Sequence, residues 1–170
     1  MGKTLKWIGI IFGGLIVVLL VAGVGLYAAG RSRLAQTYNI EPAAIAIPDD
    51  EASLARGQHL ATAVSACGEC HGEGLRGEAF FDDPVLGTVV SANLTRGEGG
   101  IGGSYSDEDW LRAIRHGVGP DGRPLLIMSS QHFQNMNAED LGALVAYLKS
   151  LPPVDNALPK TSVTPSYLAT

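Results

Sequence analysis

Two cysteines and a histidine stand together in the sequence Cys67-Gly68-Glu69-Cys70-His71. Two thiols separated by two residues lie on one short turn, where they can form thioethers with the two vinyl groups along one edge of a porphyrin. The imidazole that follows directly then falls beneath the iron as an axial ligand. C-x-x-C-H is the attachment pattern of a covalently bound c-type haem. The sequence therefore predicts one haem c, attached through Cys67 and Cys70 with His71 on the iron.

Other uses of a cysteine pair fit this chain less well. A structural zinc site requires four ligands, and the sequence contains no further cysteine. A redox-active dithiol of the thioredoxin type belongs to a β-α-β unit, and no strand pattern precedes Cys67. A disulfide across two intervening residues would be strained and would not explain His71. These comparisons favour haem attachment.

The stretch from Trp7 to Ala29 contains 23 residues and no charge. A helix of this length covers about 34 Å, enough to cross a hydrocarbon core of about 30 Å. Trp7 and Tyr27 stand near its ends, where aromatic rings favour the membrane interface. A cleavable signal peptide is the alternative, but its apolar region spans only about 7–15 residues. We therefore predict an uncleaved transmembrane anchor over residues 1–30.

The charges beside the anchor do not set its orientation, because two basic residues flank each end. These are Lys3 and Lys6 on one side and Arg31 and Arg33 on the other. Haem c attachment takes place outside the cytoplasm in c-type cytochromes generally. A single-pass protein of the bacterial cytoplasmic membrane is therefore expected, with a cytoplasmic N-terminus and a periplasmic body. All seventeen Asp and Glu residues follow the anchor, and an acidic body without a basic stripe argues against nucleic acid as a partner.

The rest of the chain divides into a spacer, a domain and a tail. Residues 31–50 contain two prolines and no helical apolar stripe, which predicts a partly extended stalk that lets the domain swing above the membrane. The domain is predicted over residues 51–153. Residues 154–170 contain two prolines and few large apolar side chains, and are predicted to form an irregular tail.

Three amphipathic helices are predicted within the domain. Each begins at a residue type that caps helix N-termini and carries apolar residues at helical spacing. The predicted capping residues are Asp49 or Asp50, Ser106 and Asn137. The first helix is expected over residues 51–65, the second ends at Gly117, and the third ends before Pro152.

A glycine-rich region separates the first two predicted helices. Residues 72–103 contain nine glycines, which predicts a long loop region. Such a loop ordinarily counts against a compact fold. A haem inside the domain changes this expectation, because the loops can pack on the ring. The predicted fold class is therefore all-α.

The order of these features resembles the small class I cytochrome c fold behind one N-terminal transmembrane helix. More specific motifs resemble the haem domains of cytochrome c subunits of membrane alcohol and aldehyde dehydrogenases. The matching segments are ANLT (92–95), GIG (100–102), SDEDW (106–110), RHGVGPDGRP (115–124), DL (140–141) and AYL (146–148). The resemblance covers about residues 52–154. Those subunits often carry three such domains, whereas one C-x-x-C-H predicts one haem here.

The resemblance also implies the second axial ligand of the iron. In the family, a methionine follows the G-x-P-D-G-R-type segment and precedes the Asp-Leu pair of the last helix. Met128 occupies this place, twelve residues before Asp140. Met136, His132, an open sixth position and a packing role for Met128 remain alternatives. Candidates to pair with the haem propionates are Arg76, Arg112 and Arg123.

These features predict an anchored monohaem electron carrier that is not itself a catalyst. With His71 and Met128 on the iron, substrate has no ready access, and a thioether ligand raises the reduction potential. The expected partners are membrane redox complexes such as a dehydrogenase, a quinol-oxidising complex or a terminal oxidase. Two alternatives remain. One is a haem enzyme or gas sensor with an open sixth site, and the other is a cytochrome subunit fixed in a larger respiratory or dehydrogenase complex.

Overall fold

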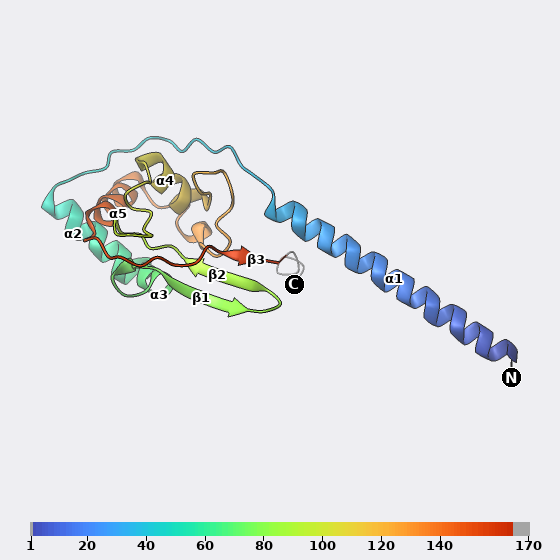
Figure 1. The fold of residues 1–170 in the computed structure, drawn as a ribbon. Helices are drawn as coiled ribbons and strands as arrows, with labels where there is room; N and C mark the ends of the chain where they lie inside the picture. Colours follow the sequence, from blue (N-terminus) through green and yellow to red (C-terminus); the bar gives the residue numbers. More distant parts are fainter. Residues whose placement is uncertain (1, 165–170) are drawn as a thin grey trace.

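The computed structural model describes residues 2–164 of the chain. Residue 1 of the predicted anchor and residues 165–170 of the predicted tail lie outside this range. The helices are α1 (Gly2–Leu34), α2 (Glu51–His59), α3 (Cys67–His71), α4 (Asp107–His116) and α5 (Ala138–Ser150). The strands are β1 (Glu78–Asp83), β2 (Gly87–Ser91) and β3 (Ser162–Val163). Figure 1 shows α1 projecting from a body that contains all the other elements.

Helix α1 is long and apolar enough to cross a membrane. Its 33 residues correspond to about 50 Å. The helix continues beyond the predicted boundary at residue 30, because the segment from Arg31 to Leu34 contains neither glycine nor proline. The two arginines of its last turn, Arg31 and Arg33, also suit the negative end of the helix dipole.

The three predicted helices of the body are confirmed, together with their capping residues. Asp50 caps α2 by accepting a hydrogen bond from the Ser53 amide at 3.0 Å. The helix continues as a π-helical turn over Leu60–Val64, so the helical segment reaches almost to its predicted end. Ser106 and Asp109 form a capping box at the start of α4. Asn137 caps α5 through the Asp140 amide at 2.7 Å.

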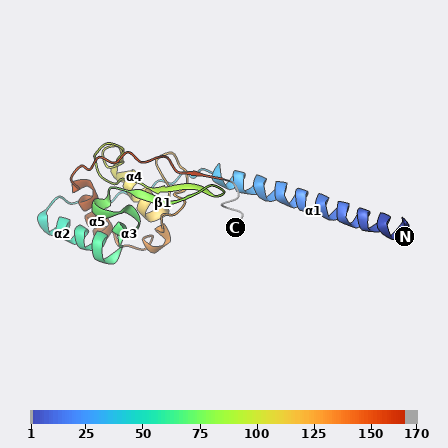
Figure 2. The same cartoon turned by 60° about the horizontal axis from the view of Figure 1, so that its bottom comes forward.

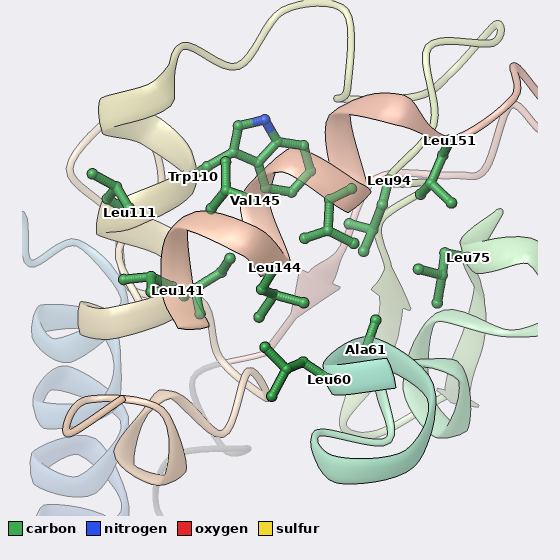
Figure 3. Packing of buried hydrophobic residues seen from close by; sticks show 12 residues of the cluster. Leu60, Ala61, Leu75, Leu94, Trp110, Leu111, Leu141, Leu144, Val145 and Leu151 are labelled. Atoms are coloured by element: carbon green, nitrogen blue, oxygen red, sulfur yellow. The ribbon is translucent and has the colours of Figure 1, made fainter. Parts of the chain in front are cut away.

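The core forms where α2 crosses α5. A Cβ atom at Gly57 would lie 2.0 Å from the Ala143 carbonyl oxygen, so only glycine permits this close crossing. Figure 3 shows leucines of α5 facing Leu60 and Ala61, with Trp110 of α4 covering the other side. The cluster consists of Leu60, Ala61, Leu75, Leu94, Trp110, Leu111, Ile114, Leu141, Leu144, Val145, Leu148 and Leu151. Burial of this apolar surface supplies the main stabilisation of the body.

A small antiparallel sheet corrects the all-α prediction. Strands β1 and β2 form a hairpin, and β3 pairs with the outer edge of β2. Asp83 closes the hairpin by accepting hydrogen bonds from the amides of Val85 and Leu86, each at 2.8 Å. Phe80, Phe81 and the valines of β2 are strand-forming residues. Their short runs lie within the glycine-rich region that was expected to be loop.

The two segments that flank the helical body both lie on it. Residues 38–48, here called the N-terminal strap, run in extended form from the end of α1 along the body to α2 (Figure 1). Residues 152–164, here called the C-terminal strap, cross the loop that precedes α4 and end in β3. The region expected to act as a swinging stalk is therefore in contact with the body in this structure.

Candidate haem site

The C-x-x-C-H segment occupies its own short helix. The chain leaves the π-helical turn at Val64 and bends at Ala66, which adopts a left-handed conformation with φ 47° and ψ 41°. For a residue other than glycine this conformation costs about 1–2 kcal/mol. The bend starts α3 as a separate element, and Gly72 with φ 69° ends it. The five residues of the motif are thereby presented on a single helical turn.

The two thiols differ in their surroundings. Both cysteines are free, with Cys67 partly buried and Cys70 exposed. Cys67 packs against the core cluster, and this burial raises the pKa of its thiol. The spacing of three residues places both thiols on adjacent positions of the helix surface. Cys67 therefore lies toward the core and Cys70 toward solvent. This arrangement suits attachment of one edge of a flat ring.

His71 is held by a partner that the sequence did not indicate. Its Nδ1 lies 2.8 Å from the carbonyl oxygen of Ala92. Burial lowers the pKa of His71, and the hydrogen bond to Ala92 opposes this shift only in part. The ring is therefore neutral at pH 7, and Nδ1 donates its proton to the carbonyl. Nε2 is then left as the basic nitrogen that can ligate iron.

The candidate sixth ligands pack on the same core. Met128 and Met136 are both partly buried and both contact the cluster that Cys67 also contacts. This common packing brings Met128 and the cysteine segment onto one core but does not distinguish the two methionines. His132 is exposed at the end of a short 3₁₀ turn.

The three candidate arginines have different environments. Arg112 is engaged within the protein, with Nε donating to the Ile40 carbonyl at 2.8 Å and a terminal nitrogen donating to Asp109 at 2.6 Å. Arg76 and Arg123 are exposed, and Arg123 lies 3.7 Å from the Asp121 carboxylate. Arg112 therefore serves the contact with the N-terminal strap.

Helix α4 contributes two buried donors without a partner in the described part of the chain. These are Trp110 Nε1 and Arg115 Nε. Trp110 packs edge-to-face with Tyr105 at a centroid distance of 5.2 Å, so its ring has a packing role. Such donors are rare in protein interiors and are compatible with a bound acceptor group. Neither could be assigned from sequence, because hydrogen-bond satisfaction depends on the packed structure.

A neutral histidine with a free Nε2 and a thiol pair on one turn form a donor set that fits a c-type haem. In agreement with this geometry, residues 52–148 match the model of the family described as cytochrome c oxidase, cbb3-type, subunit III. The chain belongs to this cytochrome c family. The matched range lies within the predicted domain and confirms the resemblance to cytochrome c.

Dehydrogenase cytochromes are among the similar proteins. The chain is 31% identical over 144 residues to the fructose dehydrogenase cytochrome subunit of Gluconobacter japonicus, covering 81% of this chain and 29% of that protein. It is 36% identical over 110 residues to the gluconate 2-dehydrogenase cytochrome c subunit of Pantoea cypripedii, covering 60% and 24%. The cytochrome c subunit of alcohol dehydrogenase (quinone) of Gluconobacter oxydans is 34% identical over 104 residues, covering 58% and 21%. The chain thus spans less than a third of each of these relatives.

As a cytochrome c, this chain is an electron-transfer protein. Haem c is the cofactor that the family implies. The predicted electron-carrier role is confirmed at this level, and the long apolar helix α1 provides a candidate membrane anchor.

Proposed function

We propose that the chain is a membrane-anchored monohaem cytochrome c that transfers single electrons between membrane redox partners. The hydrogen bond between His71 Nδ1 and the Ala92 carbonyl carries this proposal. It fixes the ring orientation and leaves Nε2 available for one axial position. Bound haem c supplies an iron that alternates between the ferrous and ferric states.

Cys67 and Cys70 are the proposed attachment residues. Each thiol would hold the ring through a thioether, because addition of its S–H across a vinyl C=C bond requires no net oxidation. Cys67 is partly buried and Cys70 is exposed, which supports an attached edge near the surface of the body. Electrons would therefore enter and leave near the exposed side of α3.

Met128 is the proposed sixth ligand. Its side chain packs on the core cluster that Cys67 also contacts, so Met128 would be available to a haem held by Cys67 and Cys70. A thioether ligand would stabilise the ferrous state and would leave no open position on the iron for a substrate. Arg115 of α4 carries a buried Nε without a partner in the described residues, and its terminal nitrogen donates to the Met136 carbonyl at 2.8 Å.

The proposed placement in the cell combines the candidate anchor α1 with the attachment of haem c outside the cytoplasm. We propose that α1 crosses the bacterial cytoplasmic membrane once, with the N-terminus in the cytoplasm and the haem domain in the periplasm. The proposed division is an anchor (1–30), a linking segment (31–50), a cytochrome domain (51–153) and a tail (154–170). The partner is proposed to be a membrane dehydrogenase, a quinol-oxidising complex or a terminal oxidase. Similarity to dehydrogenase cytochromes supports the first of these, including a place as a fixed component of such a complex.

Optical spectra of the purified full chain test the ligand set. The oxidised wild-type protein is expected to show the weak long-wavelength methionine–iron band, and the reduced protein is expected not to bind carbon monoxide. Met128→Ala should lose the band, bind the gas and have a lower reduction potential. The intact mass after denaturation should exceed that of the polypeptide by one haem.

Met136→Ala is the matched control, because this methionine packs on the same cluster. It should keep the band and exclude carbon monoxide. Ready binding of the gas by the wild-type protein would favour an enzyme or sensor with an open sixth site. Loss of the band in Met136→Ala with retention in Met128→Ala would assign the ligand to Met136 instead.

A further inference from the structure

The N-terminal strap is attached to the body at its first residue. The Tyr38 amide donates to the Gly122 carbonyl at 2.7 Å. Two residues further on, Arg112 Nε donates to the Ile40 carbonyl at 2.8 Å, while Asp109 holds the other end of the guanidinium. These contacts join the strap to α4 and to the turn that follows it.

The second half of the strap packs on the core. Ile45 and Ile47 are partly buried against the core cluster, and Ala46 between them approaches α5. A Cβ atom at Gly142 would lie 2.3 Å from the Ala46 carbonyl oxygen, so the strap backbone occupies a place that only glycine leaves open. The alternation of the two isoleucines directs both of them to the same side of an extended chain.

The strap follows α1 almost without a break. The amides of Ala35 and Gln36 still donate to the carbonyls of Arg31 and Arg33, at 3.1 and 3.2 Å. Thr37 already lies beside Gly122, since a Cβ atom there would be 3.7 Å from the Thr37 Cβ. The helix end and the first body contact are therefore separated by one joint at residues 36–38. Figures 1 and 2 show the body beginning directly beyond the end of α1.

This joint limits how far the domain can move from the end of α1. A free segment of residues 35–50 would span up to about 55 Å when extended. With the strap on the body, the joint between Gln36 and Tyr38 adds only about 7 Å. The difference decides whether the domain can search a wide volume or stays at one height above the membrane.

We propose that the N-terminal strap holds the cytochrome domain at a fixed height and orientation beside the membrane surface, so that its electron partner is a complex seated in the same bilayer. This inference rests on the proposed function as an anchored electron carrier. A partner that diffuses freely in the periplasm would not require a fixed height. A partner in the same membrane presents its own redox site at a constant height, which a short rigid joint can match.

Two insertions of the same ten Gly and Ser residues test the proposal in the full chain. The first is placed between Gln36 and Thr37, where it lengthens the joint by about 17 Å on average. The second is placed between Pro48 and Asp49, after the strap, where both flanking segments are fixed to the body. A docked strap predicts that only the first insertion moves the domain. A free tether predicts that both insertions act equally.

The height of the domain above the membrane is measured in vesicles that contain the full chain. Energy transfer from fluorescent lipid headgroups to the haem reports this height. The first insertion should lower the transfer efficiency at least about twofold, as the added chain lets the domain leave the surface. The second insertion should leave it unchanged. Equal changes in both variants, or no change in either, would overturn the proposal.

Hydrogen exchange of the Tyr38 amide tests whether the strap is docked, independently of whether the chain carries haem. The Tyr38 amide should exchange slowly in the wild-type chain, and Gly142→Ala should accelerate its exchange at least about tenfold because the strap is displaced. This readout does not require haem. Absence of haem from the purified chain would therefore refute the proposed function alone, whereas rapid exchange of Tyr38 in the wild-type chain would refute the docked strap alone.

Discussion

The N-terminal strap and the C-terminal strap cross the body in extended form, but different kinds of contact hold them. The N-terminal strap relies on packing of Ile45 and Ile47 and on the partly exposed Arg112. The C-terminal strap is bound by buried polar side chains. Asn93 donates to the Val154 carbonyl at 2.8 Å, and Thr95 Oγ1 accepts from the Val154 amide at 3.0 Å.

This difference indicates that the C-terminal strap is part of the fold of the body, whereas the N-terminal strap is attached to its surface. Asn93 and Thr95 are 1% and 0% exposed, so loss of their partners would leave unsatisfied polar groups in the interior. The C-terminal strap is therefore required for the loop before α4 to hold its shape. The N-terminal strap can leave the body at a lower cost, because its backbone groups and Arg112 can hydrogen-bond to water.

The largest expected effect is on the C-terminal strap. Asn93→Ala removes the donor to Val154 and the acceptor for the Thr95 amide and hydroxyl, at 2.9 and 2.8 Å. The free energy of unfolding should fall by about 2–4 kcal/mol, because several buried groups lose their partners together. Urea unfolding of the detergent-solubilised chain, followed by circular dichroism, measures this loss.

The exposed Asn135 provides the matched control for this substitution. Asn135→Ala should change the stability by less than about 0.5 kcal/mol. Equal stability of the two alanine variants would show that the buried polar contacts of the C-terminal strap contribute little, and would remove the contrast between the straps.

A smaller effect is expected at the contact between the N-terminal strap and α5. Gly142→Ala places a methyl group against the Ala46 carbonyl and should destabilise the chain by about 1–2 kcal/mol, after a partial offset from the higher helix propensity of alanine. Gly103→Ala is the control, because a Cβ atom there meets open space. Thermal unfolding of the two variants gives the comparison. A Gly142→Ala variant more stable than the wild type would contradict the close contact.

The smallest expected effect concerns the ion pair that supports the strap. Partial burial raises the pKa of Asp109, but hydrogen bonds from Ser106 and Arg112 outweigh this and lower it below its usual value. A carboxylate with a lowered pKa stabilises the fold above about pH 4, and the contribution is lost as the pH falls through the folded-state value. Asp109→Asn should therefore cost about 1 kcal/mol at pH 7, from weakened capping and loss of the charge.

The pH profile provides the check for this prediction. The stability difference between Asp109→Asn and the wild type should shrink as the pH falls below about 4. Asp121→Asn is the control, because this carboxylate is exposed and lies 3.7 Å from Arg123. A difference that stays constant down to about pH 3 would show that the Asp109 charge does not support α4 or the strap.

The helices could be predicted from sequence because their signals are local. Asp50, Ser106 and Asn137 cap the helices within three residues of their own positions. The straps and the sheet depend on partners that are distant in sequence. The Val154 contacts with Asn93 and Thr95 bridge about sixty residues, so a segment rich in proline was expected to be irregular. The alternation of Ile45 and Ile47 was the only local sign that residues 31–50 have a buried side.

The candidate site shows the same division between features with a local signal and features that depend on contacts distant in sequence. The cysteine pair and His71 could be identified because their chemistry depends on spacing in the chain. Ala92 could not, since a backbone carbonyl carries no residue-specific signal and lies 21 residues away. Met128 stays a prediction, because Met136 packs on the same cluster and sequence distance alone separates the two.

The crossing of α2 and α5 also has a consequence for the order of folding. The ion pair between Arg56 and Asp140 joins residues 84 positions apart, and the proposed haem-bearing residues lie inside the loop that this crossing closes. Closing so long a loop is slow relative to the formation of local helices. During synthesis α5 emerges after α2 and after the cysteine segment, so the thiols of Cys67 and Cys70 remain accessible until α5 is complete. The topology thus provides a time window in which the proposed haem could be attached before α2 and α5 come together.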